Sequence, residues 1–327
     1  MRRAQERLFD TIRSRIPEQY RLVDVIEELL EVGTDSAYRR IRGDKELSFS
    51  ELRKLCHTFH LSMDELLGYD SEQGALFRYT PLRIEPQDYI RHIERLSKAL
   101  GALAAAEDRV LYFTAQDIPF YHFLYHEELL FFWLYVWYDS ATPGRISFRE
   151  FHSRMDPDIY SPLHEQLRRE YLQIPSKEIW TGQTANTMLR LLEFYMETGA
   201  FDSREIAFLL LRRLLELLDR VSRSAETGYK DAGRRTPFSL YNCSVDPGSN
   251  IVLARRGGKW ICTVKLYAVN NLTTHNVSLC DETRKWVNNL VLKSTLISGG
   301  TSERERFRFF QALKDKVEAL IRKLEPK

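Results

Sequence analysis

The chain has 327 residues, of which 43% are hydrophobic and 29% charged, a composition typical of a soluble globular protein with room for two domains. Its net charge of only +2 excludes a globally basic nucleic-acid binder, so any basic surface must be local. The four cysteines form no C-x-x-C pair and fit neither a zinc site nor a disulfide framework. The N-terminus has no apolar signal segment, and together these features predict a cytoplasmic protein.

Residues 1–68 are predicted to form a domain of five short helices. Apolar side chains recur at helical spacing, and small or capping residues separate the runs. Gly33 stops the second run, and Thr34 or Asp35 is a suitable N-cap for the third. Ser48 or Ser50 opens the fourth. The expected spans, in chain order, are 4–16, 22–30, 34–43, 48–59 and 62–68.

The segment VGTDSAYRRIRGDKELSFSELRKL, residues 32–55, gathers four cations just after a small-residue turn. A helix-turn-helix needs a bracing helix, a tight turn and a second helix that enters the major groove of DNA. Residues 22–43 meet each need. If Ala37 and Ile41 pack inward, then Ser36, Arg39 and Arg40 are expected on one outer face. Arginine can fork onto guanine and neutralise phosphates, which the chemistry of DNA binding requires.

Residues 20–67 resemble the lambda-repressor and Cro-like family of helix-turn-helix regulators, also called the Xre family. GDKELSFSELRKLCHTFHLSMDELL matches in spacing the family's stretch through its fourth and fifth helices. The resemblance implies that double-stranded DNA is a partner. The candidate DNA-binding residues are Thr34, Ser36, Tyr38, Arg39 and Arg40 facing the DNA, Arg42 and Lys45 facing phosphates, and Asp35 flanking them.

The charge of residues 1–68 limits the strength of this interface. The segment holds 12 Lys and Arg against 13 Asp and Glu, a net charge of −1. Non-specific DNA affinity should therefore be weak and strongly dependent on salt. The glutamine that the family commonly carries before its first reader helix is absent, and residues 21–24 stand in its place.

Residues 69–86 are predicted to be a linker, and residues 87–327 a larger regulatory or oligomerisation domain. Its expected parts are a helical part over 87–228 with one short strand at 110–114, a strand-rich part over 236–281, and a helical part over 282–323. Gly257 and Gly258 predict a tight hairpin, and NVSLC, residues 276–280, is a candidate strand. The expected fold class is mainly α, with a five-helix domain followed by an α+β domain that carries a small antiparallel sheet near the C-terminus.

The run LLFFWLYVWY, residues 129–138, is the most apolar stretch of the chain. Ten residues are too few to cross a bilayer, which needs roughly 20. One long buried helix is expected from Pro119 to about Tyr138. His122 and His126 would share a face of it, but no third ligand is fixed, so aromatic packing is favoured and no metal is expected. The residues that could line an effector pocket, form the core or form a dimer face are Tyr121, Tyr125, Tyr135, Trp137 and Tyr138.

The segment SGGTSERER, residues 298–306, indicates a candidate anion site at a helix N-terminus. Its residues are Gly299, Gly300, Thr301, Ser302 and Arg304, and a capped helix start explains the same letters. Serine, cysteine and paired-acid motifs of enzymes are absent, so no catalytic residue, cofactor or enzymatic activity is expected.

The segments TAQDIPFYHF, IPSKEIWTGQT and LVLKSTLISGGTSERERFRFF are similar to those of uncharacterised bacterial helix-turn-helix regulators, which implies a regulatory tail. The expected protein is a bacterial transcription regulator that forms a homodimer through its C-terminal domain, with an unknown small-molecule or protein effector and no membrane association. The alternative is an interaction scaffold whose helical N-terminal domain docks onto a protein. A third class is an enzyme steered to DNA.

Overall fold

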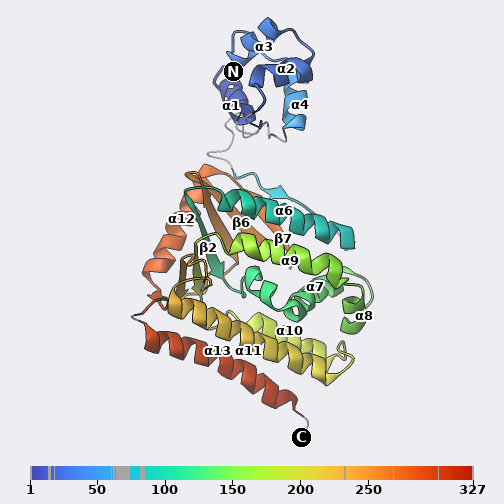
Figure 1. Ribbon diagram of the computed structural model, residues 1–327, viewed down its shortest axis with the longest axis vertical. Coiled ribbons are helices and arrows are strands. Elements are labelled where there is room, and N and C mark those ends of the chain that lie inside the picture. The colour runs from blue at the N-terminus through green and yellow to red at the C-terminus, as the bar shows by residue number, and fades with distance from the viewer. Residues whose placement is uncertain are drawn as a thin grey trace. The chain divides into compact units, whose positions relative to one another are not determined.

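The computed structural model describes residues 2–13, 16–17, 19–59, 61, 63, 74–81, 85–231, 233–267, 269–300 and 302–325 (Figure 1). The chain divides into two compact units, Met1–Leu76 and Phe77–Lys327. We call them the head and the larger unit. Apart from Met63, the predicted fifth helix over 62–68 lies outside the described residues.

The described part of the head contains α1 Arg2–Arg13, α2 Leu22–Leu30, α3 Thr34–Ile41 and α4 Phe49–Thr58. Each helix is amphipathic and turns its apolar stripe toward one small core. Ile12, Ile26, Ala37 and Leu55 are fully buried in that core. The first four predicted helices are therefore confirmed to within a few residues.

One eight-stranded mixed sheet organises the larger unit. Its strands are β1 Arg78–Tyr79, β2 Arg109–Ala115, β3 Ser176–Trp180, β4 Phe238–Asn242, β5 Ile251–Arg256, β6 Lys259–Tyr267, β7 Asn270–Thr274 and β8 Thr295–Leu296. They lie in the order β1-β7-β6-β5-β2-β3-β4-β8. β2, β3 and β4 are parallel, and the other neighbours are antiparallel.

The predicted fold class was wrong, because this unit is α/β rather than helical with a small antiparallel sheet near the C-terminus. The antiparallel strands of the region 236–281 continue through β5 into β2 and then into the parallel strands β3 and β4. β3 was not predicted from the sequence. Its five residues, SKEIW, include a lysine and a glutamate and lack the apolar run typical of a buried parallel strand.

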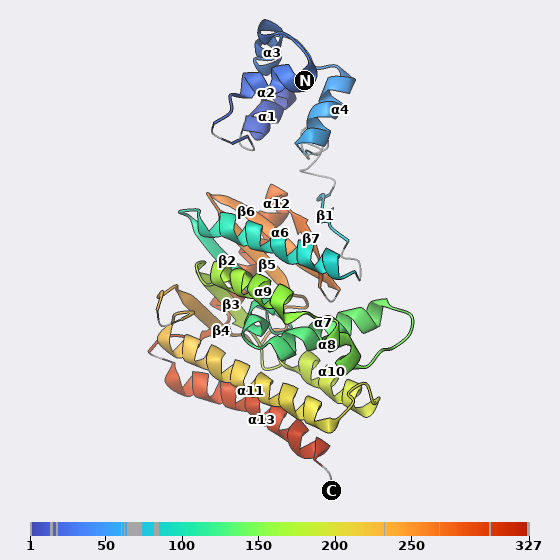
Figure 2. The same cartoon turned by 45° about the vertical axis from the view of Figure 1, so that its right-hand side comes forward.

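Helices cover both faces of the sheet (Figures 1 and 2). They are α6 Pro86–Ala104, the 3₁₀ helix η1 Phe120–Tyr125, α7 Glu127–Ala141, α8 Phe148–Ser153, α9 Pro157–Tyr171, α10 Asn186–Glu197, α11 Arg204–Thr227, α12 Val277–Leu292 and α13 Glu303–Leu324. On one face, α6 lies beside α9 and α11 beside α13. On the other face α12 packs against β6.

Alternate side chains of the strands belong to two different cores. Phe113 and Trp180 lie in the large core under α6, α9 and α11. Ile179 and Leu253 lie in the smaller core with Cys280 of α12. All four cysteines are free and buried.

Among the local predictions, one hairpin is confirmed and others differ from the structure. The Gly257-Gly258 hairpin is confirmed, with φ values of 54° and 77° between β5 and β6. The single helix expected over 119–138 is instead η1 and α7, which are separated at His126 because that residue is extended, with φ −139° and ψ 92°. The candidate strand 276–280 is the start of α12. β1 and the first residue of α6 fall inside the predicted linker.

Candidate functional site

The helix-turn-helix geometry lies in α2, the turn 31–33 and α3. α2 ends where Glu31 adopts the left-handed conformation, with φ 56° and ψ 46°, and its N–H bonds to the carbonyl of Glu27. The Thr34 hydroxyl donates to Glu27 Oε2 at 2.9 Å, which links the start of α3 to α2. Ala37 is fully buried and holds α3 against the core. Because the side chain of Ala37 is small, α3 can pack closely against α2.

The outer face of α3 consists of Thr34, Asp35, Tyr38, Arg39 and Arg42, all of them exposed. Each lies three or four residues from at least one other, which places them along one side of the helix. Side chains on that side could reach base edges and phosphates in a major groove. This face carries the candidate nucleic-acid interface.

Arg40 does not belong to the outer face. Its side chain is only 5% exposed and points toward α4, where Nη2 lies 2.6 Å from Glu51 Oε1 and Nε lies 3.1 Å from the same oxygen. Its Nη1 donates to the carbonyl and hydroxyl oxygens of Ser36, which is half-buried. The sequence interpretation placed Ser36 and Arg40 beside Arg39 on the outside, whereas the structure turns both toward α4. Arg40 follows Ala37 by three residues, so it shares the inward side of the helix.

Glu51 of α4 makes two separate contacts, one with α3 and one with the N-cap of its own helix. Its Oε1 pairs with Arg40, and its Oε2 accepts the backbone N–H of Ser48 at 2.8 Å in a capping box. Burial alone would raise the pKa of Glu51. The hydrogen bonds and charge of Arg40, together with the Ser48 contacts, outweigh burial and hold that pKa below its ordinary value. The carboxylate therefore stays ionised and fixes the orientation of α3.

Two further residues position the interface. Gln5 of α1 donates to the carbonyl oxygens of Arg40 at 2.7 Å and Lys45 at 2.8 Å, so it holds the loop that follows α3. Arg21, exposed at the N-cap of α2, donates to the Tyr38 hydroxyl at 3.1 Å. Sequence reasoning missed both roles, because the contacts join residues 17 to 40 positions apart in the chain.

The charge of the interface is modest. Arg42 Nε pairs with Asp44 Oδ2 at 3.0 Å, and Asp35 is exposed beside Arg39. Lys45 is exposed in the loop after α3. Cations and carboxylates thus alternate around the outer face, which favours weak, salt-dependent association with phosphates over a strong electrostatic attraction.

A second cluster of polar groups is buried under the sheet of the larger unit. Glu178 of β3 is fully buried and accepts hydrogen bonds from His122 Nε2 at 2.8 Å, the Tyr171 hydroxyl at 2.9 Å and Trp180 Nε1 at 2.9 Å. Lys230 is 5% exposed, donates to the Tyr171 carbonyl at 3.0 Å and lies over its ring. Burial opposes ionisation of Glu178, but His122, Lys230 and Tyr171 keep its pKa below the ordinary value. We call these five residues the Glu178 network.

His122 is neutral in this network. Arg220 can only donate, so its Nη2 contact of 2.9 Å makes His122 Nδ1 an acceptor and leaves the proton on Nε2, which donates to Glu178. Burial lowers the pKa of His122, and the charge of Arg220 lowers it further, against the opposing effect of Glu178. His126, expected on the same helix face, lies beyond the end of η1, where Nδ1 is 3.7 Å from Glu216. No cluster of three metal-binding side chains occurs among the described residues.

The predicted anion site gains no support from its contacts. The Gly299 amide donates to the Ala225 carbonyl at 2.8 Å, and the Gly299 carbonyl accepts from the buried Arg306 at 2.9 Å. Ser302 makes no side-chain cap, and Arg304 is exposed. Gly300 is exposed as well, and Thr301 lies outside the described residues. Arg306 therefore holds this loop onto the fold, and anion binding stays a prediction.

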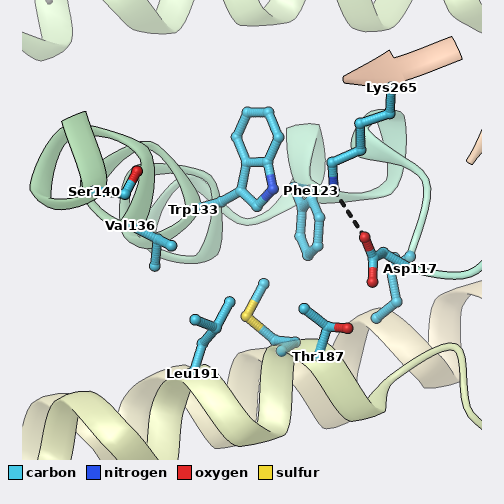
Figure 3. Close-up of a pocket in the computed structure, with 10 residues that line it drawn as sticks. Asp117, Phe123, Trp133, Val136, Ser140, Thr187, Leu191 and Lys265 are labelled. Carbon is cyan, nitrogen blue, oxygen red and sulfur yellow. Dashed lines mark hydrogen bonds and ion pairs between the residues drawn. The ribbon is translucent and has the colours of Figure 1, made fainter. Parts of the chain in front are cut away.

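The aromatic residues in and near α7 lie in different environments. Tyr121, Tyr135 and Trp137 are buried in the large core, as the core interpretation expected. Tyr125 is half-buried beneath the Arg220 guanidinium, 3.5 Å from its ring centre, and Tyr138 packs on the same core. A cavity does open beside α7, but other residues line it, among them Phe123 and Trp133 (Figure 3).

Comparison with known proteins gives one match. The family described as the BetR domain matches residues 5–116, so this part of the chain, from α1 through β2, is similar to BetR domains. The match is compatible with a regulatory or DNA-binding role and consistent with bacterial regulation. No curated protein and no solved structure matches the chain. In the described part of the chain, no helix is both long and apolar enough to span a membrane.

Proposed function

We propose that the protein is a sequence-specific DNA-binding transcription regulator whose α3 enters the major groove. The observation that carries this proposal is the outer face of α3, where Tyr38, Arg39 and Arg42 are exposed side by side on a helix held from behind by Arg40 and Glu51. A rigidly held helix with exposed arginines is suited to reading base edges. The similarity of residues 5–116 to BetR domains is compatible with this role.

The larger unit, in this proposal, brings two copies of the chain together. A single helix-turn-helix offers few base contacts, and dimers that bind two half-sites gain the specificity that a genome demands. The described residues of the head form only a small core, so we assign dimerisation to residues 77–327. Sedimentation of the full chain, with and without the selected DNA, would measure this state.

The experiment that tests the proposal is selection of bound duplexes from a random-sequence pool at two salt concentrations. The wild type is compared with Arg39→Ala and with Arg13→Ala, a matched loss of one exposed arginine. Arg13 is a suitable control because it lies eight residues, about 12 Å, beyond the Gln5 contact along α1. We expect the wild type and Arg13→Ala to enrich one common motif and Arg39→Ala to lose it. Failure of the wild type to enrich any motif at low salt would reject DNA reading.

One observation favours the alternative that the head docks onto a protein. Phe49, the first residue of α4, is 73% exposed, and an exposed aromatic side chain is a common anchor of protein interfaces. On this alternative, partner binding should survive Arg39→Ala and be lost in Phe49→Ser. DNA reading predicts the opposite dependence, so the two variants separate the two functions.

A further inference from the structure

A cavity of about 280 Å³ opens in the larger unit between α7 and α10 (Figure 3). Trp133 and Val136 of α7 lie on one side, and Thr187 and Leu191 of α10 lie on the other. Water occupies about 30 Å³ per molecule in the liquid, so the space corresponds to about nine waters. It can hold an organic molecule of about ten non-hydrogen atoms, and its walls are mainly apolar.

An ion pair forms one end of the cavity. Lys265 Nζ lies 2.8 Å from Asp117 Oδ2, and Asn250 Nδ2 donates to the same oxygen at 2.9 Å. Burial opposes ionisation of Asp117, but Lys265, Thr187 and Asn250 hold its pKa below the ordinary value. Both partners are therefore charged, and each compensates the other. The polar end is neutral as a whole while still offering a donor and an acceptor.

The cavity lies at the edge of the sheet at which α/β folds bind ligands. Asp117 follows β2 by two residues, and Thr187 lies in the first turn of α10, which follows β3. β2 and β3 are parallel neighbours, so the segments after them meet at the carboxyl edge of the sheet. Ligands of open α/β sheets bind outside this edge at points where the strand order reverses. The cavity shares the edge but not such a point, because the chain passes from β2 through β3 to β4 in one direction. The position and the ion pair are independent observations that favour the same assignment.

We propose that this cavity binds a small uncharged organic molecule, with its apolar body between Trp133 and Leu191 and a hydroxyl, amide or carbonyl group at the Asp117–Lys265 pair. A charged ligand would be disfavoured, because it would have to break that pair or bring an uncompensated charge to a half-buried site. This inference goes beyond DNA binding, since no part of the cavity belongs to the head.

Three probes of nearly equal size test the charge preference: benzyl alcohol, benzoate and benzylamine. Ligand-observed NMR with the full chain should give a dissociation constant of about 1 mM for benzyl alcohol and at least about tenfold weaker binding of the two ions. In Lys265→Met the uncompensated Asp117 should favour benzylamine. In Asp117→Asn the uncompensated Lys265 should favour benzoate. Benzyl alcohol should bind each variant more weakly than the wild type, because its hydroxyl loses one of its two partners, and unchanged tryptophan fluorescence verifies that each variant is folded.

A blocking variant tests the location. Leu191→Trp places an indole in the cavity and should abolish binding of benzyl alcohol. Arg190→Trp adds the same group at an exposed neighbouring position that does not line the cavity, and it should bind as the wild type does. Absence of benzyl alcohol binding to the wild type, or equal binding to Leu191→Trp, would overturn the site. If the dissociation constants of all three probes were the same in both charge variants as in the wild type, the role of the ion pair would be overturned.

Discussion

The two units of the molecule hold a buried carboxylate in different ways. In the head, Glu51 is 18% exposed at its side chain and depends on one charged partner, Arg40 of the neighbouring helix. In the larger unit, Glu178 is fully buried and receives hydrogen bonds from three uncharged donors. The charge of Lys230 also lowers the pKa of Glu178, although burial lowers the pKa of Lys230 well below its ordinary value. A small core can exclude water from one ion pair only partly. A large core excludes it fully, so the carboxylate there needs a network.

This difference has a consequence for function. The Arg40–Glu51 pair removes one arginine from the DNA-facing set and uses it to fix the helix that presents the others. Substituting Arg39 and Arg40 together would therefore mix loss of an exposed contact with loss of a structural one. Separate variants of Arg39 and Arg40 are therefore needed.

Replacing Glu178 by leucine should destabilise the larger unit by about 4 kcal/mol, because three hydrogen-bond donors lose their acceptor inside the core. Glu178→Gln keeps an oxygen acceptor and should cost about half as much. All five tryptophans lie in the larger unit, so urea unfolding followed by tryptophan fluorescence reports on it selectively. A loss below about 1 kcal/mol in Glu178→Leu would show that the network does not stabilise the fold.

Replacing Arg40 by methionine should destabilise the head by about 3 kcal/mol, since Glu51 would remain largely buried without its partner. Amide hydrogen exchange of α2 and α4 measures this effect without interference from the larger unit. Arg39→Met, one position away but exposed, should change stability by less than about 0.5 kcal/mol. The double variant Arg40→Met with Glu51→Leu should recover most of the loss. Equal effects of Arg39→Met and Arg40→Met would contradict the assignment of Arg40 to the interior.

Acid should weaken the larger unit before it weakens the head. Burial lowers the pKa of His164 from 6.5 to about 4, and the side chain is 2% exposed. Between pH 6.5 and 4, His164 is protonated in the unfolded chain but stays neutral in the folded chain. Its contribution to the free energy of unfolding is therefore complete above about pH 6.5 and is lost as the pH falls toward 4. The loss from this one group between pH 7 and 5 is about 2 kcal/mol.

The head should lose stability at a lower pH than the larger unit. Because the pKa of Glu51 is below its ordinary value of 4.5, its contribution is complete above that pH and is lost only as the pH falls through the lower folded value. Tryptophan fluorescence should report loss of stability near pH 5, while exchange protection of α2 and α4 persists. His164→Gln should reduce the pH dependence of the fluorescence profile, and the part that remains is expected from His92 of α6, whose pKa burial also lowers to about 4. Simultaneous loss in both units, or the reverse order, would contradict this comparison.

The sequence predicted the head better than the larger unit for a physical reason. Helices of the head have local signals, such as the capping box that begins at Ser48 and the turn before α3, and these contacts span few residues. The direction of Arg40 depends on Glu51, eleven positions away on another helix, and no local pattern contains that contact. In the larger unit, the parallel pairing of β2 with β3 joins segments about 65 residues apart, so no local pattern contains it. Glu178 interrupts the apolar pattern by which a central strand such as β3 is recognised.

The central claim, that the outer face of α3 reads DNA, is tested most directly by measuring affinity for the selected duplex and for a scrambled one. Arg39→Ala should lose about 1–3 kcal/mol of affinity for the selected duplex, and much less for the scrambled one, if its guanidinium contacts a base. Arg13→Ala should match the wild type on both duplexes. Equal affinities of wild type and Arg39→Ala for the selected duplex would contradict the claim.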